Sequence, residues 1–307
     1  MEIKKPFFWK DINLIAIILY PISLISNFYN FFKSLNKKKK YNIKVICVGN
    51  IYIGGTGKTP LVIKIKEILK NKFHTVFIKK KYLNQIDEQK LLKKNGDLIC
   101  APKRSESLNQ AIKKKYKLAI LDDGLQQKNI YHDISIVCFN SSSKSGNNLV
   151  LPAGPLREKL SNLKFYDAVF INGEISNRKF VQKIKSINEN IKIFEGKYKI
   201  INKKKWNKKI KYLVFSGIGN PEEFQNTLTK NKFKVYEHIK FPDHYDYSIS
   251  DIKKIKYKAA KKKLQILTTE KDYMRLRKDY TKNINYIKIE LEIKNLRAFK
   301  LFLTKKL

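Results

Sequence analysis

Residues 44–60 read KVICVGNIYIGGTGKTP, and this stretch decides the expected fold. The β-branched residues Val45, Ile46 and Val48 predict a buried strand, and the glycines that follow predict a tight loop. From Lys58 onward, the apolar residues recur at helical spacing. A strand, a glycine-rich loop and a helix in that order are typical of a phosphate-binding loop, or P-loop. We therefore expect an α/β domain built on a parallel sheet.

The loop carries the residue types that phosphate binding requires. Glycines let backbone N–H groups close around an anion, and the start of the next helix adds partial positive charge. Lys58 is expected to reach the β- and γ-phosphates of ATP, and the hydroxyl of Thr59 to bind Mg²⁺. Tyr52 stands where the usual GxxxxGK[ST] pattern has its first glycine, so an ordinary glycine-rich turn is the alternative. The predicted cofactor-binding residues are Gly54, Gly55, Thr56, Gly57, Lys58 and Thr59.

A second stretch, residues 117–127 with the sequence KLAILDDGLQQ, places two carboxylates after an apolar strand. Enzymes with a P-loop present an acid to Mg²⁺ in this way, at the carboxyl edge of a parallel sheet. Asp122 and Asp123 are therefore candidate metal ligands. An Asp-Asp-Gly string alone is also typical of a simple turn, but the P-loop upstream favours the metal site.

The chain has 307 residues, enough for two α/β units, and a formal net charge of +40 at pH 7. Such a charge can indicate nucleic acid or an anionic membrane as a partner. Only six of the 66 basic residues are Arg, and the Lys residues are spread along the chain without a nucleic-acid-binding motif. We expect a solvated Lys-rich surface, with binding to anionic lipid as the alternative. Cys47, Cys100 and Cys138 lie in apolar runs and are expected to be reduced core residues in the cytosol.

Residues 9–32 form the most apolar segment, and Lys residues flank it on both sides. Pro21 interrupts the segment, and the uninterrupted apolar run before it covers only residues 14–20. A helix that spans a bilayer needs about 20 mostly apolar residues. Flanking Lys and aromatic side chains are typical of a helix that lies in the membrane interface. We expect interfacial anchoring, with a spanning helix and a helix packed on its own domain as the alternatives.

The remaining sequence indicates a second, smaller α/β unit. After an expected strand at 167–172, a weakly patterned Lys-rich stretch predicts a linker. From residue 212, YLVFSGIGNPEEF reads again as a strand, a glycine turn and a helix. The predicted organisation is an N-terminal membrane-associated helix at 1–36, a P-loop domain at 37–195, a linker at 196–211 and a smaller α/β domain at 212–307 that includes a returning linker strand.

Five separated strings carry a resemblance to a known family: VGNIYIGGTGKTP, LDDGLQQ, LPAGPLRE, GIGNPEEF with FPDHYDY, and TTEKD. In this order and spacing, over about residues 41–276, they resemble the tetraacyldisaccharide 4′-kinase family, the lipid A 4′-kinases of Gram-negative bacteria. The resemblance implies a P-loop NTPase-type domain with a parallel sheet, a smaller α/β domain joined by a β-stranded linker, and an N-terminal segment at the inner membrane. It also implies transfer of the γ-phosphate of ATP to the 4′-hydroxyl of tetraacyldisaccharide 1-phosphate in lipid A biosynthesis.

Residue roles follow from the positions that match this family. Asp87 matches its proposed catalytic base, with Arg104 as the Arg downstream, and His244 matches the histidine paired with that base. A carboxylate oriented by a His would help to deprotonate a sugar hydroxyl. Arg157 is expected to hold an anionic group of substrate or nucleotide, and Glu158 to orient it. The expected catalytic residues are Asp87, His244 and Lys58, the metal ligands are Thr59, Asp122 and Asp123, and the substrate-binding residues are Tyr82, Gln126, Arg157 and Glu158.

The sequence departs from the family pattern between the second strand and the expected base. Residues 79–82 read KKKY where the family usually has a Ser-Arg-Gly-Tyr-Gly string, and the loop that leads to Asp87 is short. One alternative function is therefore a kinase of the same family that acts on a different glycolipid. The other is a P-loop NTPase stimulated by nucleic acid, which the net charge would favour.

The resemblance also implies cofactors, partners and a location. ATP and Mg²⁺ are the expected cofactors, and the lipid A disaccharide precursor and the inner-membrane surface are the expected partners. No nucleic-acid partner is expected. We expect a monomer at the cytoplasmic face of the inner membrane, held there as a peripheral or monotopic protein.

Overall fold

The computed structural model describes residues 6–34, 37–82, 85–174, 178–202, 206–207 and 209–307, with the backbone alone at 29–31, 33 and 34. The chain divides into two compact units. The larger unit contains Lys5–Lys81, Asn95–Lys197 and Leu291–Leu307, and the smaller unit contains Tyr82–Lys94 and Tyr198–Glu290.

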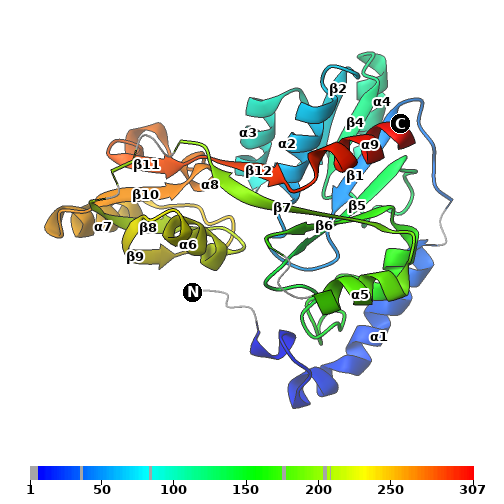
Figure 1. The fold of residues 1–307 in the computed structure, drawn as a ribbon, viewed down its shortest axis with the longest axis horizontal. Coiled ribbons are helices and arrows are strands. Elements are labelled where there is room, and N and C mark those ends of the chain that lie inside the picture. The colour runs from blue at the N-terminus through cyan, green and yellow to red at the C-terminus, as the bar shows by residue number, and fades with distance from the viewer. Residues whose placement is uncertain (1–5, 35–36, 83–84, 175–177, 203–205, 208) are drawn as a thin grey trace. The chain divides into compact units, whose positions relative to one another are not determined.

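An eight-stranded sheet organises the larger unit (Figure 1). The strand order is β12-β7-β6-β5-β1-β4-β2-β3, and all neighbours from β7 to β3 are parallel. β4, β5 and β6 are buried along their whole length, which explains why each is a continuous apolar run in the sequence. The strands are β1 (Lys44–Gly49), β2 (Thr75–Lys80), β3 (Leu98–Ala101), β4 (Leu118–Asp122), β5 (Ile134–Asn140), β6 (Ala168–Asn172), β7 (Lys192–Ile200) and β12 (Ile289–Ile293).

Helices connect these strands and complete the core of the larger unit. α2 begins directly after the glycine-rich loop, and Pro60 fits its first turn because no backbone N–H is required there. The predicted α/β class with a parallel sheet is confirmed. The α-helices of this unit are α1 (Leu14–Ser34), α2 (Lys58–Leu69), α4 (Arg104–Lys113), α5 (Arg178–Ile187) and α9 (Leu296–Lys306), and the 3₁₀ helices are η1 (Phe7–Trp9) and η3 (Leu160–Phe165).

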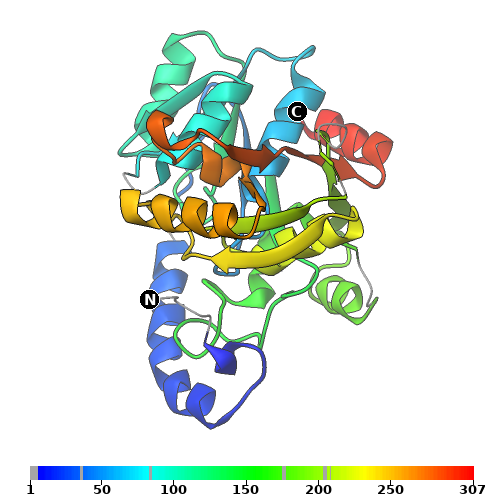
Figure 2. The same cartoon turned by 90° about the vertical axis from the view of Figure 1, so that its left-hand side faces the viewer.

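α1 lies at the periphery of the larger unit, at the blue end of the ribbon (Figures 1 and 2). One face is anchored by Ser23, whose hydroxyl donates to the carbonyl oxygen of Val150 at 2.8 Å and accepts from the backbone N–H of Ala153 at 3.1 Å. Elsewhere the helix exposes apolar side chains, such as Ile18 at 65% and Ile25 at 71%. Among the described helices, none combines the length and the apolar character that crossing a bilayer requires.

The smaller unit contains a four-stranded sheet in the order β11-β10-β8-β9, and all three neighbouring pairs are parallel. Side chains of β8 alternate between its two faces, because successive residues of a strand point in opposite directions. Leu213 and Phe215 pack in the cluster that includes α7, and Tyr212 and Val214 pack in the cluster that includes α6. The elements are β8 (Lys211–Ser216), β9 (Lys234–Lys240), β10 (Gln265–Thr269), β11 (Ile284–Ile287), α3 (Ile86–Asn95), α6 (Pro221–Lys230), α7 (Ile249–Lys261), α8 (Glu270–Tyr273) and η5 (Lys278–Tyr280).

The two units differ from the predicted ranges in three places. Residues 82–94 cluster with the smaller unit although they precede β3, and 291–307 return to the larger unit. The predicted linker at 196–211 begins inside β7, which pairs with β6 as a regular strand. Gly196 of β7 lets the chain pass close to Phe170, since a Cβ there would lie 2.7 Å from the ring. Residues 203–205 and 208 of that linker, 83–84 of the loop before Asp87, and 1–5 and 35–36 of the N-terminal segment lie outside the described residues.

Candidate active site

The glycine-rich loop leads from β1 into α2 and is shaped for close approach to an anion. Gly54 and Gly57 have φ values of 119° and 77°, a region that favours glycine. The amide nitrogen of the buried Asn50 donates to the carbonyl oxygens of Tyr52 at 2.6 Å and Gly54 at 3.2 Å. These bonds hold two carbonyl groups of the loop. Lys58 then begins α2, where helix N–H groups without intrahelical partners favour a phosphate.

Asp122 ends β4, and its carboxylate pairs with the first turn of α2. Oδ2 accepts a hydrogen bond from the Thr59 hydroxyl at 3.1 Å and another from Nζ of Lys79 at 2.8 Å. Oδ1 is buried and has no hydrogen-bond partner among the described residues. A carboxylate oxygen with spare acceptor capacity beside a hydroxyl is the kind of ligand set that Mg²⁺ prefers. The residues therefore fit Mg²⁺, although no group of three or more His, Cys, Asp or Glu side chains in the described part of the chain could hold a metal alone.

Asp123 follows on a turn with a φ of 58° and attracts two cationic side chains. Nζ of Lys58 lies 3.7 Å from its Oδ1, and Nη1 of Arg157 lies 3.3 Å from the same atom. Burial alone would raise the pKa of Asp123, but the charges of Lys58 and Arg157 outweigh it and lower the pKa. Nη1 of Arg157 also donates to Oε1 of Gln126 at 3.2 Å, and Nε2 of Gln126 donates to the carbonyl of Asn50 at 2.7 Å. Gln126 thus ties Arg157 to the P-loop.

Arg104 begins α4 and fixes the turn that carries both carboxylates. Its Nη2 donates to the carbonyl oxygens of Asp122 at 3.1 Å and Asp123 at 2.6 Å, and its Nη1 donates to Oε1 of Gln127 at 3.3 Å. Arg104 lies in the larger unit, whereas Asp87 lies in the smaller one. The hydrogen bonds of Arg104 therefore position the Asp122 and Asp123 pair.

Glu158 is held in a cluster of its own. Its carboxylate accepts hydrogen bonds from Lys128 at 2.8 Å, Asn162 at 2.8 Å and the Tyr166 hydroxyl at 2.6 Å, and the side chain is 3% exposed. Burial and the neighbouring Glu158 raise the pKa of Tyr166 well above its ordinary value, so the phenol remains a donor. The contacts of Glu158 stabilise the loop after residue 157, while Asp123 and Gln126 orient Arg157.

In the smaller unit, Asp87 lies in the first turn of α3 and is only 2% exposed. Its Oδ1 lies 3.1 Å from Nδ1 of His244, and its Oδ2 accepts a hydrogen bond from Nη2 of Arg275 at 2.7 Å. Nζ of Lys271 lies 3.5 Å from Oδ2, 3.4 Å from Nε2 of His244 and 2.9 Å from the carboxylate of Glu88. A carboxylate and an imidazole predicted from strings far apart in sequence are therefore brought into direct contact.

Arg275 connects Asp87 to a second buried carboxylate, Asp272. Oδ1 of Asp272 accepts from Nη1 of Arg275 at 3.1 Å, from the Tyr247 hydroxyl at 2.9 Å and from the backbone N–H of Gly217 at 3.0 Å. Nη1 of Arg275 also donates to the carbonyl of Gly217 at 2.7 Å. A Cβ at Gly217 would lie 2.9 Å from the backbone carbonyl oxygen of Pro242 and 3.0 Å from the Tyr247 hydroxyl, so a larger residue would require the backbone to shift.

The backbone of His244 also depends on Gly217. His244 has a φ of 60°, an uncommon conformation for a residue with a side chain, and its N–H donates to the carbonyl of Gly217 at 3.2 Å. Strain of this kind costs on the order of 1 kcal/mol and persists where the surroundings enforce it. Here the aromatic rings of Phe241, Tyr245 and Tyr247 pack together around the loop.

The charges around Asp87 fix its ionisation. Burial alone would raise its pKa, but the hydrogen bond from His244 and the charges of Lys271 and Arg275 hold the pKa well below its ordinary value. Burial would likewise lower the pKa of Lys271, yet the carboxylates of Glu88 and Asp243 raise it. Asp87 is therefore an anion and Lys271 a cation at neutral pH.

Comparison with known proteins places the chain in a family. The sequence profile described as Tetraacyldisaccharide-1-P 4'-kinase (LpxK) matches residues 15–307. The chain belongs to this family. A relative from Pelagibacter ubique (strain HTCC1062), named Tetraacyldisaccharide 4'-kinase, is 50% identical over 297 residues, with 95% of each chain covered. A relative of the same name from Rickettsia typhi (strain ATCC VR-144 / Wilmington) is 34% identical over 319 residues, with 96% of each chain covered.

A solved structure of an LpxK protein shares the fold. The crystal structure of the "apo" form of LpxK from Aquifex aeolicus in complex with ATP matches with a TM-score of 0.71 and 22% identity, covering 95% of this chain and 99% of that chain. The likeness confirms the predicted fold class, and the family match confirms the resemblance to the LpxK family that the five strings indicated.

The structure groups the predicted LpxK-type site residues into two sets, one in each unit. The P-loop residues and Asp122, Asp123, Gln126, Arg157 and Glu158 belong to the larger unit, and Tyr82, Asp87 and His244 to the smaller one. Tyr82 is 40% exposed, and its carbonyl oxygen accepts a hydrogen bond from Gln89 at 2.9 Å.

The charged residues whose site contacts the sequence motifs did not predict include Lys79, Lys271, Asp272 and Arg275. The TTEKD string contains Lys271 and Asp272, and Arg275 follows three residues after it. The string therefore indicated this part of the chain, although it did not indicate what these side chains contact. Lys79 gave no signal, because one Lys in a run of three does not show which side chain is buried.

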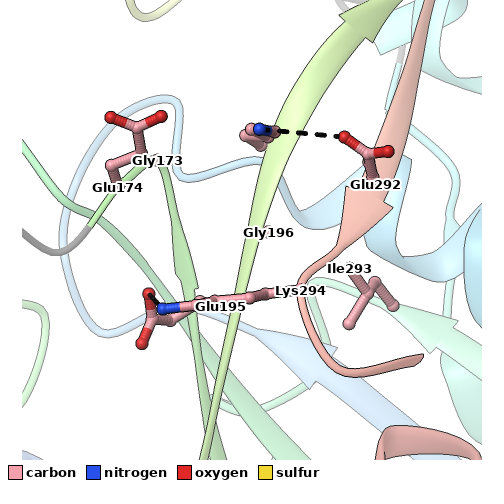
Figure 3. Close-up of a pocket in the computed structure, with 8 residues that line it drawn as sticks. Gly173, Glu174, Glu195, Gly196, Glu292, Ile293 and Lys294 are labelled. Atoms are coloured by element: carbon pink, nitrogen blue, oxygen red, sulfur yellow. Dashed lines mark ion pairs between the residues drawn. The ribbon is translucent and has the colours of Figure 1, made fainter. Parts of the chain in front are cut away.

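A cavity of about 510 Å³ lies apart from these residues, along β7, β12 and the end of β6 (Figure 3). Its charged groups largely pair with one another: Lys197 lies 4.0 Å from Glu292, and Lys294 lies 3.6 Å from Glu195. No predicted site residue lines this cavity, and we assign it no part in the chemistry.

Proposed function

We propose that this chain is an ATP-dependent kinase that phosphorylates the 4′-hydroxyl of tetraacyldisaccharide 1-phosphate, a lipid A precursor. The observation that carries the proposal is the contact of 3.1 Å between Thr59 and Asp122 beside the P-loop, in a chain that is 50% identical to a tetraacyldisaccharide 4'-kinase. The complex of the Aquifex aeolicus protein with ATP supports ATP as the phosphoryl donor.

In this proposal the larger unit binds the nucleotide. The N–H groups of the glycine-rich loop and Nζ of Lys58 hold the phosphates, and Thr59 and Asp122 hold Mg²⁺. Charge neutralisation on the β- and γ-phosphate oxygens is the chemistry that Mg²⁺ supplies when bound. Asp123 keeps Lys58 and Arg157 in place until an anionic group competes for them, and Arg157 then binds that group of substrate or nucleotide.

The smaller unit supplies the proposed base. Asp87 is ionised at neutral pH, and His244 and Arg275 fix the direction of its carboxylate. A carboxylate has about four acceptor positions, so Asp87 retains capacity for a hydrogen bond from the sugar hydroxyl. Because its pKa is low, Asp87 would accept the proton only as phosphoryl transfer proceeds, and most of the rate would come from positioning and electrostatics.

The membrane surface is the proposed place of action. α1 exposes large apolar side chains, including Ile17 at 58% and Phe28 at 65%, and the chain carries a net charge of +40. Exposed apolar groups combined with basic groups favour an anionic bilayer surface. We infer a monomeric peripheral or monotopic protein at the cytoplasmic face of the inner membrane, where a lipid A precursor would be accessible.

The direct test is transfer of the γ-phosphate of ATP to purified tetraacyldisaccharide 1-phosphate in detergent with Mg²⁺. Wild type should phosphorylate the 4′-hydroxyl, and Lys58→Ala should lower kcat at least ~10²-fold while the circular dichroism spectrum is unchanged. A folded wild type that binds ATP but does not phosphorylate this acceptor would overturn the substrate assignment. Other glycolipid acceptors would then be tested, since residues 79–82 depart from the family pattern.

A further inference from the structure

The candidate metal site in the larger unit already contains a cation of the protein. Nζ of Lys79, near the end of β2, lies 2.8 Å from Oδ2 of Asp122, and the two side chains are 2% and 0% exposed. The Thr59 hydroxyl donates to the same Oδ2 atom at 3.1 Å. The ammonium group of Lys79 therefore shares a carboxylate oxygen with the hydroxyl that is expected to bind the metal.

The charges around this carboxylate are predominantly positive. Lys79 pairs with the carboxylate of Asp122, and Lys58 and Arg157 pair with that of Asp123. Arg104 adds a fourth positive charge and donates to the backbone carbonyls of both aspartates. Lys79 is the member of this group that pairs with the Asp122 carboxylate itself. At such distances and in a buried site, one unit charge changes the affinity for a second cation by at least ~10-fold. An excess of positive charge disfavours a free divalent cation and favours a polyphosphate.

We propose that Lys79 makes binding of a divalent cation at Asp122 depend on nucleotide. Without nucleotide, Lys79 neutralises Asp122, and the surrounding cations repel a divalent ion. With nucleotide bound, the phosphate charges compensate these cations, and Asp122 can share its carboxylate between Lys79 on Oδ2 and a divalent cation on Oδ1. Lys79 is thus a positioning residue that prevents metal from occupying the site before the nucleotide. This inference rests on the proposed function, because it requires a nucleotide and metal site at Asp122.

The test measures binding of Mn²⁺, as a paramagnetic substitute for Mg²⁺, to the nucleotide-free full chain by electron paramagnetic resonance. Lys79→Met removes the charge and nearly preserves the side-chain length. The variant should bind Mn²⁺ at least ~10-fold more tightly than wild type. Lys80→Met is the matched control, since the next residue of a strand points to the opposite face. It should bind Mn²⁺ as wild type does.

A second measurement needs no variant and covers the case in which Lys79→Met does not fold. For wild type, Mg²⁺ alone should leave Tm unchanged, whereas Mg²⁺ with ADP should raise Tm above the value with ADP alone. A rise of Tm with Mg²⁺ alone would overturn the inference, as would equal Mn²⁺ affinities of wild type and a folded Lys79→Met. If wild type binds Mn²⁺ only with nucleotide and Lys79→Met behaves identically, this inference fails and the proposed function stands. A wild type that does not bind ADP at all would overturn both.

Discussion

Asp122 and Asp87 are both buried carboxylates with cationic partners, and the comparison between them separates two uses of a buried charge. Asp122 ends a strand of the larger unit and has one direct cationic partner, Lys79, while its Oδ1 atom has no partner in the described structure. Asp87 lies in the first turn of a helix in the smaller unit, and His244, Lys271 and Arg275 engage both of its oxygens. Asp122 is therefore arranged to accept one more ligand, and Asp87 to remain ionised in a fixed orientation.

The two sites also differ in how the free-energy cost of burying the carboxylate is compensated. Each site compensates the cost of burying charge with ion pairs and hydrogen bonds, as isolated buried charges require. At Asp122 the direct ion pair in the described structure is with Lys79 alone, so a single substitution should have a large effect. In the smaller unit it is distributed over His244, Lys271 and Arg275, so the loss of one of these partners should be less severe. Two substitutions, at Asp122 and Asp87, test this contrast, and two more probe buried groups outside both clusters.

Asp122→Asn should have the largest effect. We expect kcat to fall at least ~10³-fold, because the metal-binding charge is lost, and the free energy of unfolding to fall by about 3 kcal/mol, because the buried ammonium group of Lys79 would lose the opposite charge of its carboxylate partner. Initial rates and urea unfolding measure the two effects. The double variant Asp122→Asn/Lys79→Met should regain stability but not activity. If the single variant were as stable as wild type, the ion pair between Lys79 and Asp122 would make no contribution to the free energy of unfolding.

Asp87→Asn should lower kcat at least ~10²-fold with little change in KM for ATP, because it removes the proposed base and keeps the shape of the side chain. Steady-state rates with the lipid acceptor measure this. Asp246→Asn, in the same loop region as His244 but exposed, is the matched control and should behave as wild type. Wild-type rates for Asp87→Asn would remove Asp87 from the mechanism and leave the cluster a purely structural role.

Glu158→Gln should affect stability more than catalysis. The variant replaces the acceptor of three hydrogen bonds in a buried cluster, so we expect the free energy of unfolding to fall by about 1–3 kcal/mol. The kcat should change less than for Asp87→Asn. Denaturant unfolding, together with kinetics at a temperature well below Tm, distinguishes a structural role of Glu158 from a role in substrate binding. A higher KM for the lipid at unchanged stability would instead support the substrate-binding role predicted from the sequence.

The smallest expected effect is the pH dependence of stability that His238, in the smaller unit, contributes. Burial and the charge of Lys240 lower the pKa of His238 to about 4, and its Nε2 lies 2.8 Å from the hydroxyl of Ser216. Because the folded-state pKa is below the unfolded value of about 6.5, the neutral ring contributes stability above pH 6.5 that is lost as pH falls toward 4. Between pH 7 and pH 5, the free energy of unfolding of wild type should fall by on the order of 1 kcal/mol more than that of His238→Gln. Urea unfolding at pH 7 and pH 5 measures these changes. If the free energy of unfolding fell equally for wild type and His238→Gln, the assignment to His238 would be contradicted.

The two sites also differ in how far the sequence alone could predict them. The P-loop and Asp122 follow from local patterns, because a strand, a glycine-rich loop and a helix start are contiguous, and a carboxylate after an apolar strand lies at the edge of a parallel sheet. The pairing of Asp87 with His244 joins residues that are 157 positions apart. No spacing rule predicts such a contact, and only the resemblance to a family suggested it.

The sequence by itself determined the α/β class, the P-loop, the strand that ends in Asp122 and the family. These features depend on local patterns, since hydrophobic periodicity and glycine positions report directly on backbone conformation. Only the tertiary structure decided which charges are buried and what they pair with: Lys79 on Asp122, Arg275 on Asp87, and Glu158 in a cluster with Lys128. Burial depends on which segments fold over a side chain, and in a chain with so many Lys residues the identity of a residue does not show which one lies inside.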